Sequence, residues 1–305
     1  MQRLAAIAER LLRGAAPDEL RDSCAALHEL LTEVAGAETL DSADIALPSG
    51  LAIAPAAAAQ CILDTNRTVA FVRGVWSAIG EMRHDPIEIV YAGTGPFAPL
   101  AIPLMALPEI RNVRFTLIDL HAQAVASVTK LVERFGLRAS VRDIVCADAV
   151  TYRHPDPIHI AITETMQQAL KTEPFVEIVR NLRGQLAPGG VLVPARVSIS
   201  VATVDPISQQ ARWRDRSVQV TRGERTTIFE ITAAGERDAP VTVNLQPGWV
   251  TLFTDIDVFG DIRLTEYDSG LTTPDILWPL SEGAGGEVTF HYARGSTPGI
   301  QWART

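Results

Sequence analysis

The sequence predicts an α/β protein with a doubly wound, Rossmann-like parallel sheet, helices before it and a β-rich domain after it. From Pro86 to Val193, short apolar stretches alternate with amphipathic ones, which is typical of parallel strands joined by helices. After Pro194, apolar residues alternate with polar ones and Gly, Pro and Asp separate the stretches, which indicates antiparallel strands. We therefore expect an N-terminal helical segment over 1–57, a nucleotide-binding type of domain over 58–194 and a β-rich domain over 195–305.

Apolar residues at helical spacing predict two amphipathic helices at the start of the chain. The first covers about residues 4–12, and the second begins at Pro17 and ends at Gly36. We expect both to pack against the main domain or a second subunit. The Ala- and Pro-rich stretch 37–58 indicates a linker or loop, and a third helix is expected from about Ala57 to Met82.

Five apolar stretches are expected to form the parallel sheet: Ile87–Tyr91, Val113–Ile118, Val141–Val145, Ile158–Ile162 and Val191–Val193. Helices are expected between them, over Ala122–Phe135 and from Pro174 to Leu182. In the β-rich domain we expect no helix and seven strands, at about Val197–Val201, Thr226–Thr232, Val241–Leu245, Trp249–Val258, Ile262–Tyr267, Glu287–Tyr292 and Ile300–Trp302.

The composition limits the classes of function. A net charge of −9 over 305 residues disfavours nucleic acid and anionic membranes as partners, because binding phosphate needs basic patches. Three cysteines lie far apart without C-x-x-C spacing, so neither a disulfide framework nor a metal site is expected. The N-terminus carries charges where a signal peptide needs an apolar run, and prolines break the longest apolar stretches. We therefore expect a cytoplasmic protein with no membrane span.

A glycine turn follows the first strand of the sheet. The run Gly93-Thr-Gly95-Pro-Phe-Ala98 fits G-x-G-x-x-G/A, and we expect it to open a helix and to let the backbone approach a nucleotide. Asp119, at the end of the second strand, suits ribose hydroxyls. This pattern alone fits a dinucleotide or S-adenosylmethionine, or a turn without a cofactor. Asp148 after the third strand, the long N-terminal segment and two acids after the fourth strand favour S-adenosylmethionine.

Two glutamates follow the fourth strand, nine residues apart. Glu164 comes directly after the apolar strand, and Glu173 comes before Pro174, where a helix is expected to start. Two carboxylates facing one pocket suit a planar cation with several N–H donors, and a guanidinium is such a cation. Other interpretations fit each acid alone: an acid at a helix start is favoured by the helix dipole, and Glu164 could be part of a solvated loop.

These features resemble the protein arginine methyltransferases over about residues 58–200. Three segments carry the resemblance: Ile162-Thr-Glu164-Thr-Met166 followed by Glu173 resembles the double-glutamate loop, Asp64-Thr-Asn-Arg67-Thr68 resembles the Asp-x-x-Arg-Thr of the preceding helix, and Leu186-Ala-Pro-Gly-Gly-Val-Leu-Val-Pro194 resembles the segment before the β-barrel. The resemblance implies a Rossmann-like methyltransferase domain followed by a β-barrel-like domain.

The resemblance also implies roles for individual residues. Glu164 and Glu173 would grip the acceptor guanidine, Arg67 would pair with the carboxylate of the methyl donor, and Met166 would lie in the acceptor loop. The family's Thr-His-Trp loop has no clear match, and Trp278 is the nearest candidate.

The sequence also departs from the family. Tyr91 and Phe97 stand where the family usually has an acid and a third glycine, and no helical dimerisation arm is evident. These departures fit a small bacterial-type relative that methylates free L-arginine or another guanidine, and they leave a homodimer open.

Three alternatives stay open at the level of sequence. The first is a methyltransferase of another small molecule or of arginyl protein, because no sequence feature separates free arginine from an arginyl peptide. The second is a nicotinamide-dependent oxidoreductase, which accounts for the glycine turn and Asp119 but not for the acid pair or Arg67. The third is a catalytically inactive binding module, given Tyr91 and Phe97.

Overall fold

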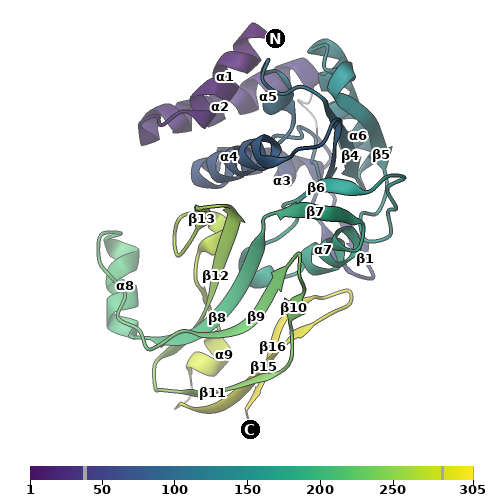
Figure 1. Cartoon of the computed structure of the whole chain (residues 1–305). Coiled ribbons are helices and arrows are strands. Elements are labelled where there is room, and N and C mark those ends of the chain that lie inside the picture. The colour runs from purple at the N-terminus through teal and green to yellow at the C-terminus, as the bar shows by residue number, and fades with distance from the viewer. Residues whose placement is uncertain (37–39, 283–284, 305) are drawn as a thin grey trace.

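Five parallel strands form the central sheet in the order β5-β4-β3-β6-β7 (Figure 1). The computed structural model describes residues 1–36, 40–282 and 285–304. The strands are β3 (Ile87–Ala92), β4 (Val113–Asp119), β5 (Val141–Cys146), β6 (Ile158–Thr163) and β7 (Leu186–Val193). The first four lie close to their expected positions, whereas β7 begins earlier than the expected Val191. The strand order reverses at β3, because β4 and β5 lie on one side of it and β6 and β7 on the other. In such sheets ligands bind outside the carboxyl ends of the strands at this switch point.

Short helices connect the strands of the sheet. They are α5 (Ile102–Met105), α6 (Ala122–Arg134) and α7 (Phe175–Arg183), with single 3-10 turns η2 (Arg138–Ser140) and η3 (Gln168–Leu170). The expectation that the glycine turn opens a helix is wrong, because α5 begins only at Ile102. The residues between are held in turns, and Ala98 has a left-handed φ of 41° that a helix does not accommodate.

Two amphipathic helices begin the chain, as the apolar spacing predicts. They are α1 (Gln2–Leu12) and α2 (Pro17–Ala35), and Gly36 ends α2 in the left-handed conformation that glycine adopts most readily. The expected linker 37–58 is only partly a loop, and its residues 37–39 lie outside the described residues. Its later part forms a hairpin of β1 (Ile45–Leu47) and β2 (Gly50–Ala52) and the start of α3 (Pro55–Gln60).

The single helix expected from Ala57 to Met82 is three elements. After α3 come the 3-10 turn η1 (Cys61–Leu63) and α4 (Thr65–Glu81). Asp64 stands between them with a non-helical ψ of 90°, and its side chain accepts a hydrogen bond from the backbone N–H of Arg67. An aspartate in this position caps the N-terminus of a helix, which is why α4 starts afresh here.

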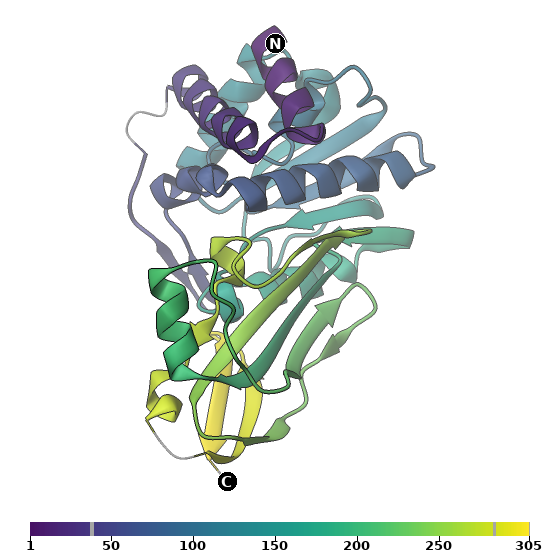
Figure 2. The ribbon, with the colours of Figure 1, turned by 90° about the vertical axis from the view of Figure 1, so that its left-hand side faces the viewer.

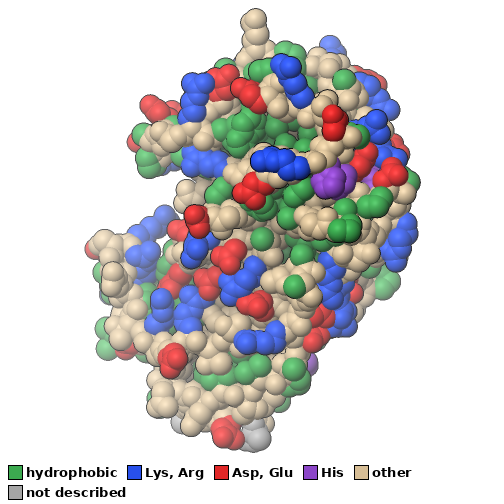
Figure 3. All heavy atoms as spheres, in the orientation of Figure 1, with side chains coloured by type: hydrophobic (Ala, Val, Ile, Leu, Met, Phe, Trp, Pro, Cys, Tyr) green, Lys and Arg blue, Asp and Glu red, His purple; other side chains and the backbone are tan. Residues whose placement is uncertain are grey.

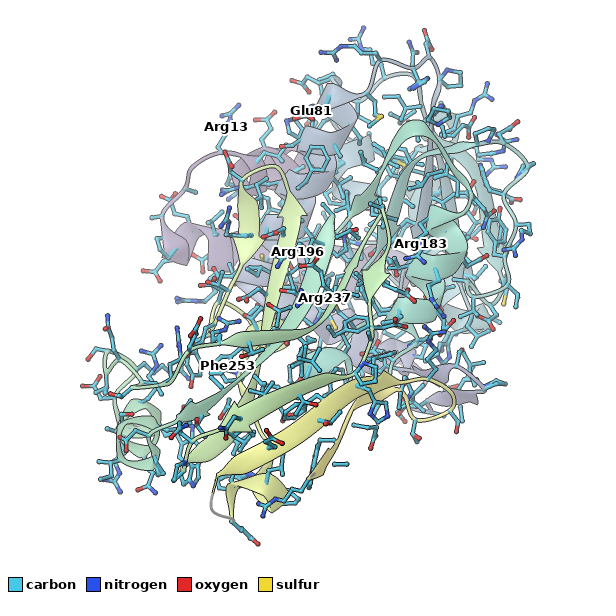
Figure 4. The ribbon with its side chains drawn as sticks, turned by 60° about the horizontal axis from the view of Figure 1, so that its bottom comes forward. Arg13, Glu81, Arg183, Arg196, Arg237 and Phe253 are labelled. Atoms are coloured by element: carbon cyan, nitrogen blue, oxygen red, sulfur yellow. The ribbon has the colours of Figure 1, made fainter. Side chains whose placement is uncertain are left out.

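The β-rich part consists of two antiparallel sheets. The larger has the order β10-β9-β8-β12-β13 with β14 added on β12, and the smaller has the order β11-β15-β16. Their strands are β8 (Arg196–Val204), β9 (Thr226–Thr232), β10 (Glu236–Arg237), β11 (Val241–Leu245), β12 (Trp249–Phe259), β13 (Ile262–Leu264), β14 (Asp275–Ile276), β15 (Gly286–Ala293) and β16 (Gly299–Arg304). Cross-strand ion pairs link three of these strands. Arg196 of β8, labelled in Figure 4, donates to Glu230 of β9 at 2.7 Å and to Asp257 of β12 at 3.0 Å.

The expectation of no helix after Pro194 is wrong. The structure has α8 (Pro206–Arg214), the 3-10 turn η4 (Gly270–Thr272) and α9 (Trp278–Ser281) there. Asp205 caps α8 by accepting the backbone N–H of Ser208 at 2.7 Å, and Pro206 occupies the first helical position. This Asp-Pro pair is a helix start signal that the alternation of the neighbouring strands obscures.

Helix α4 joins the two parts of the molecule. It lies between α1 and α2 on one side and the β-rich part on the other (Figure 2). The contact is so close that a Cβ atom added to Gly74 of α4 would meet Cγ1 of Val258 of β12 at 2.5 Å. One continuous cluster of buried apolar side chains therefore runs from Leu4 of α1 to Phe290 of β15. On the face shown in Figure 3, acidic and basic side chains are interspersed over the β-rich part.

Candidate active site

The carboxyl ends of the parallel strands open onto one cavity. It brings together seven of the residues that the sequence singles out: Arg67, Gly93, Gly95, Asp119, Asp148, Glu164 and Glu173. Its empty volume is about 840 Å³, which includes open solvent at the mouth. The cavity thus lies where the strand order reverses, next to both the glycine turn and the glutamates.

Asp119 ties the glycine turn to the end of β4. One carboxylate oxygen accepts the backbone N–H of Gly95 at 2.7 Å and the other accepts the backbone N–H of His121 at 2.9 Å. Burial raises the pKa of Asp119, and the two N–H groups offset part of that rise. Asp148 is half-buried and accepts the N–H of Val150 at 2.9 Å. Both carboxylates keep further lone pairs for a ligand's hydroxyl or amine.

Gly93 must be glycine for a structural reason beyond the sequence motif. Its φ is +72°, and a Cβ atom there would come within 2.1 Å of Cγ2 of Thr165. Thr165 belongs to the loop after β6 and shares a hydrogen bond of 2.9 Å with Thr163. The missing side chain therefore makes room for the segment that carries Glu164, as well as for close approach by a ligand.

The two glutamates line the cavity together. Oε2 of Glu164 lies 2.5 Å from Nη2 of Arg67, while its Oε1 is buried and has no hydrogen-bond partner among the described residues. Glu173 is 5% exposed, and burial together with the negative charge of Glu164 raises its pKa to about 8. Burial also raises the pKa of Glu164, and the nearby Arg67 opposes that rise. Such shifts are typical of residues that bind or transfer charge.

Arg67 points from the first turn of α4 toward Glu164. Burial disfavours its charge, but Glu164, Cys61 and Glu173 together outweigh that effect and hold the pKa of Arg67 above its ordinary value. The preceding Asp64 fixes this geometry, because its Oδ1 caps α4 and its Oδ2 accepts the backbone N–H of Gly270 at 2.8 Å. The Asp-x-x-Arg pattern therefore combines a helix cap with the cation that the cap positions.

The N-terminal hairpin covers the glutamate loop, a contact that the sequence does not reveal. The backbone N–H of Leu51 donates to the carbonyl of Thr172 at 2.7 Å, and Leu47, Leu51 and Ala52 line the cavity. Gly50 is required for the contact, since a Cβ atom there would lie 2.4 Å from the Thr172 carbonyl oxygen. The alternating apolar residues of the hairpin are too few to stand out from the Ala- and Pro-rich stretch around them.

Two other residues of the cavity were not singled out from the sequence. Cys61 lines it beside Arg67, and burial raises the pKa of its thiol to about 11. His121 lines it with Nε2 buried and without a partner. Each is a single residue in an ordinary sequence context, so no local pattern marks either of them.

Met166 and Trp278 do not line this cavity. Met166 is 2% exposed and belongs to the apolar core. Trp278 is 49% exposed and lines a second hollow with Lys171, Gln209, Trp213, Tyr267 and Asp275. The pairing of β14 with Thr251 and Leu252 leads the chain into α9, where Trp278 meets Trp249 edge-on with ring centroids 5.0 Å apart. Lys171 connects this hollow to the glutamate loop through its ion pair with Asp275, at 2.5 Å.

The residues where the chain departs from the resemblance are both buried. Tyr91 ends in the cavity wall, and burial, with a further contribution from Glu164, raises the pKa of its phenol well above its ordinary value. Its hydroxyl therefore stays neutral and cannot replace a carboxylate. Phe97 packs edge-on against His28 of α2, with ring centroids 5.8 Å apart. Its place in the core accounts for a large side chain at this position.

Within residues 1–36, 40–282 and 285–304, no three His, Cys, Asp or Glu side chains are grouped so that they could hold a metal ion. None of the helices described there is long and apolar enough to cross a membrane.

Comparison with solved structures establishes the fold. A chain of the Trypanosoma brucei PRMT1 enzyme–prozyme heterotetrameric complex with AdoHcy superposes with a TM-score of 0.55 at 13% identity, covering 80% of this chain and 96% of that chain. Arabidopsis thaliana protein arginine methyltransferase 10, in an open conformation, gives a TM-score of 0.54 at 14% identity, covering 77% of this chain and 86% of that chain. No protein-family model and no curated protein matches the sequence. The predicted fold class, a Rossmann-like methyltransferase sheet with a C-terminal barrel-like domain, is confirmed.

Proposed function

We propose that this protein transfers a methyl group from S-adenosylmethionine to a terminal nitrogen of a guanidino group, with free L-arginine as the acceptor. The observation that carries the proposal is the pair of carboxylates in the same cavity as the glycine turn and Asp119: Glu173, which is buried, and Glu164, whose side chain is 12% exposed. Oε1 of Glu164 is buried without a partner. A buried acceptor of this kind is costly unless a donor satisfies it, and the N–H groups of a guanidinium would do so.

Other residues of the cavity fit the methyl donor. Asp119 and Asp148 both line it, and their lone pairs would accept hydrogen bonds from the ribose hydroxyls and the adenine amine, respectively. Arg67 is the one Lys or Arg among the described residues that line the cavity, so it is the natural partner for the donor's carboxylate. When bound there, S-adenosylmethionine would supply an electrophilic methyl group. The complex of the T. brucei neighbour with AdoHcy supports this assignment.

The glutamates would orient and activate the acceptor. By accepting hydrogen bonds from two guanidinium nitrogens, Glu164 and Glu173 would localise the positive charge there and leave the third nitrogen more nucleophilic. Holding that nitrogen in line with the methyl group converts an encounter between two molecules into a reaction within one complex. Glu173 would receive the proton that the methylated nitrogen loses, a role for which a pKa of about 8 is suitable.

A small acceptor is favoured by the surroundings of the glutamate loop. In the hairpin, the backbone N–H of Leu51 donates to the carbonyl of Thr172. The N–H of Thr172 in turn donates to the carbonyl of Pro298 at 3.1 Å. The loop is therefore bracketed by backbone on both sides, which leaves less room for a polypeptide than for an amino acid. The net charge of −9 also favours a cationic substrate.

The test is methyl transfer from labelled donor to L-arginine and to an arginyl peptide, with Glu164→Gln and Glu173→Gln variants. Loss of one charge from a buried pair costs on the order of 2–5 kcal/mol, so we expect turnover to fall roughly a hundredfold or more in each variant. The double variant should be little worse than either one, because the two acids act together.

Glu177→Gln is the matched control, because Glu177 lies nearby on α7, does not line the cavity and pairs with Arg180. Binding of S-adenosylhomocysteine, measured by calorimetry, should be nearly unchanged in Glu173→Gln and Glu177→Gln and should persist in Glu164→Gln. Full activity of Glu164→Gln would overturn the guanidine assignment, and faster methylation of the peptide than of L-arginine would overturn the choice of acceptor.

A further inference from the structure

Resting on the proposed function, we propose that Arg67 couples the two ends of the cavity: it is shared between Glu164 and the carboxylate of the methyl donor, so that binding of the donor increases the affinity for the acceptor. The proposal starts from one contact. Nη2 of Arg67 lies 2.5 Å from Oε2 of Glu164, and the two side chains are only 15% and 12% exposed. Water therefore screens this pair poorly, and its charges act strongly on any ligand beside them.

Two cations would compete for the same carboxylate. The acceptor's guanidinium needs Glu164, but Arg67 already holds one oxygen of that side chain and leaves Oε1 as the free position. A guanidinium at Oε1 would also lie close to the positive charge of Arg67, and like charges at short range in a buried site repel. Acting alone, Arg67 therefore weakens the acceptor's hold on Glu164.

The donor's carboxylate changes this balance. A guanidinium has five N–H donors in a planar fork, so Arg67 can serve a second carboxylate without leaving the cavity. Among the described lining residues no other Lys or Arg is available for it. Once its charge is shared with the donor, Arg67 attracts Glu164 less and repels the acceptor less. The acceptor then binds more tightly, and by thermodynamic linkage it increases the affinity for the donor by the same factor.

The experiment measures the affinity of the whole chain for L-arginine by calorimetry, in the presence of one of two donor-site ligands at saturating concentration. One is S-adenosylhomocysteine. The other is 5′-deoxy-5′-(3-aminopropylthio)adenosine, which keeps the adenosine, the thioether and the ammonium group and lacks only the carboxylate. We expect L-arginine to bind about fivefold or more tightly with S-adenosylhomocysteine than with the analogue, since couplings between sites are typically about 5- to 150-fold. The reverse titration should give the same factor.

An Arg67→Lys variant tests whether Arg67 carries the effect. Lysine keeps the charge but is a point donor without the fork, so we expect S-adenosylhomocysteine to bind still and the coupling to fall toward unity. The control is Arg83→Lys, because Arg83 follows α4 and donates only to the carbonyls of Gly80 and Met82. Its coupling should equal that of the unaltered protein.

The outcomes separate this inference from the proposed function. If S-adenosylhomocysteine does not bind, or L-arginine binds under no condition, both the proposed function and the coupling are overturned. If S-adenosylhomocysteine and L-arginine both bind, the two donor-site ligands could raise the affinity for L-arginine equally or not at all. In that case the coupling through Arg67 is wrong and the proposed function stands. If the coupling is undiminished in Arg67→Lys, the planar guanidinium of Arg67 is not what couples the two ligands.

Discussion

At the scale of single residues, the protonation of Glu173 controls the charge of the candidate acceptor site. With a pKa of about 8, its carboxyl is mostly protonated at neutral pH and loses its proton as the pH rises. Only the charged form can pair with a guanidinium and later accept a proton. The cause of the raised pKa, burial beside Glu164, is therefore also a cause of pH-dependent activity.

We predict that kcat/KM for the acceptor rises about tenfold per pH unit below the pKa of the free protein and levels off above about pH 8. The rise in kcat should lie at lower pH, because a bound guanidinium stabilises the carboxylate. Initial rates from pH 6 to 9 check this prediction, and Glu177→Gln should show the same profile as the unaltered protein. A flat profile over that range would contradict the assignment of Glu173.

A second prediction concerns Gly93. Alanine there requires an unusual φ of +72° and would lie 2.1 Å from Cγ2 of Thr165, whereas Gly136, with a φ of +66°, has open space around it. Both Gly93→Ala and Gly136→Ala should lose about 1–3 kcal/mol of stability from backbone strain. Only Gly93→Ala should also displace the loop of Glu164 and reduce turnover.

Chemical denaturation and the methyl-transfer assay measure the two effects. Adding Thr165→Ser to Gly93→Ala removes Cγ2 and keeps the hydroxyl that bonds Thr163. We expect this double variant to recover most of the lost turnover. Equal turnover in the two single variants would show that Gly93 does not position the loop.

At this scale, the sequence allows prediction of the functional side chains that lie at the ends of strands. Asp119, Asp148 and Glu164 lie at or just beyond the ends of apolar strands. Because parallel strands end at one edge of a sheet, the meeting of these side chains could be predicted. The ion pair of Arg67 with Glu164 could not, because it depends on the rotation of α4 about its axis. The same limit applies to Trp278, whose position is set by the pairing of β14 with β12.

At the scale of elements, the cap of α4 holds the site together. Asp64 starts the helix and also reaches Gly270 in the β-rich part, at 2.8 Å. We predict that Asp64→Ala costs about 0.5–2 kcal/mol of stability for the lost cap and also weakens binding of S-adenosylhomocysteine, because Arg67 lies in the first turn.

Asp205→Ala is the matched control for this prediction. Asp205 caps α8 in the same way but lies outside the cavity lining, so its loss should lower stability without changing donor affinity. Thermal melts and calorimetry measure both quantities. A result in which both variants leave donor affinity unchanged would mean that Arg67 does not need the cap.

Helices and strands could be predicted where they are long and their pattern of apolar residues is unbroken. The inner strands of the parallel sheet, β3, β4 and β6, are almost entirely buried and stand out as apolar runs. The hairpin of β1 and β2 has three residues in each strand and is tied to the glutamate loop by the hydrogen bond from the Leu51 N–H to the Thr172 carbonyl. Such a tertiary contact leaves no local trace. Helix α8 differs, because its Asp-Pro start was visible in the sequence and the strands around it masked the signal.

At the scale of the whole molecule, the two parts share one core through α4. Gly74 packs against Val258, and the buried apolar cluster is continuous from α1 to the smaller antiparallel sheet. A fragment that ends at residue 194 would uncover this face of α4.

We predict that the fragment 1–194 shows no cooperative thermal transition, while the full chain unfolds in a single one. Differential scanning calorimetry decides the matter, and two resolved transitions in the full chain would mean that the parts fold independently.

The grouping of the tryptophans has an optical consequence. Trp249 contacts both Trp213 and Trp278, with ring centroids at 5.5 and 5.0 Å. Three of the chain's five indoles therefore form one group, and two of them, Trp213 and Trp278, line the second hollow. No indole lines the cavity of Glu164 and Glu173 among the described residues. Tryptophan emission therefore reports chiefly on the barrel-like part. A ligand that changes this emission strongly on titration has touched the second hollow, whereas one confined to the cavity leaves it nearly constant.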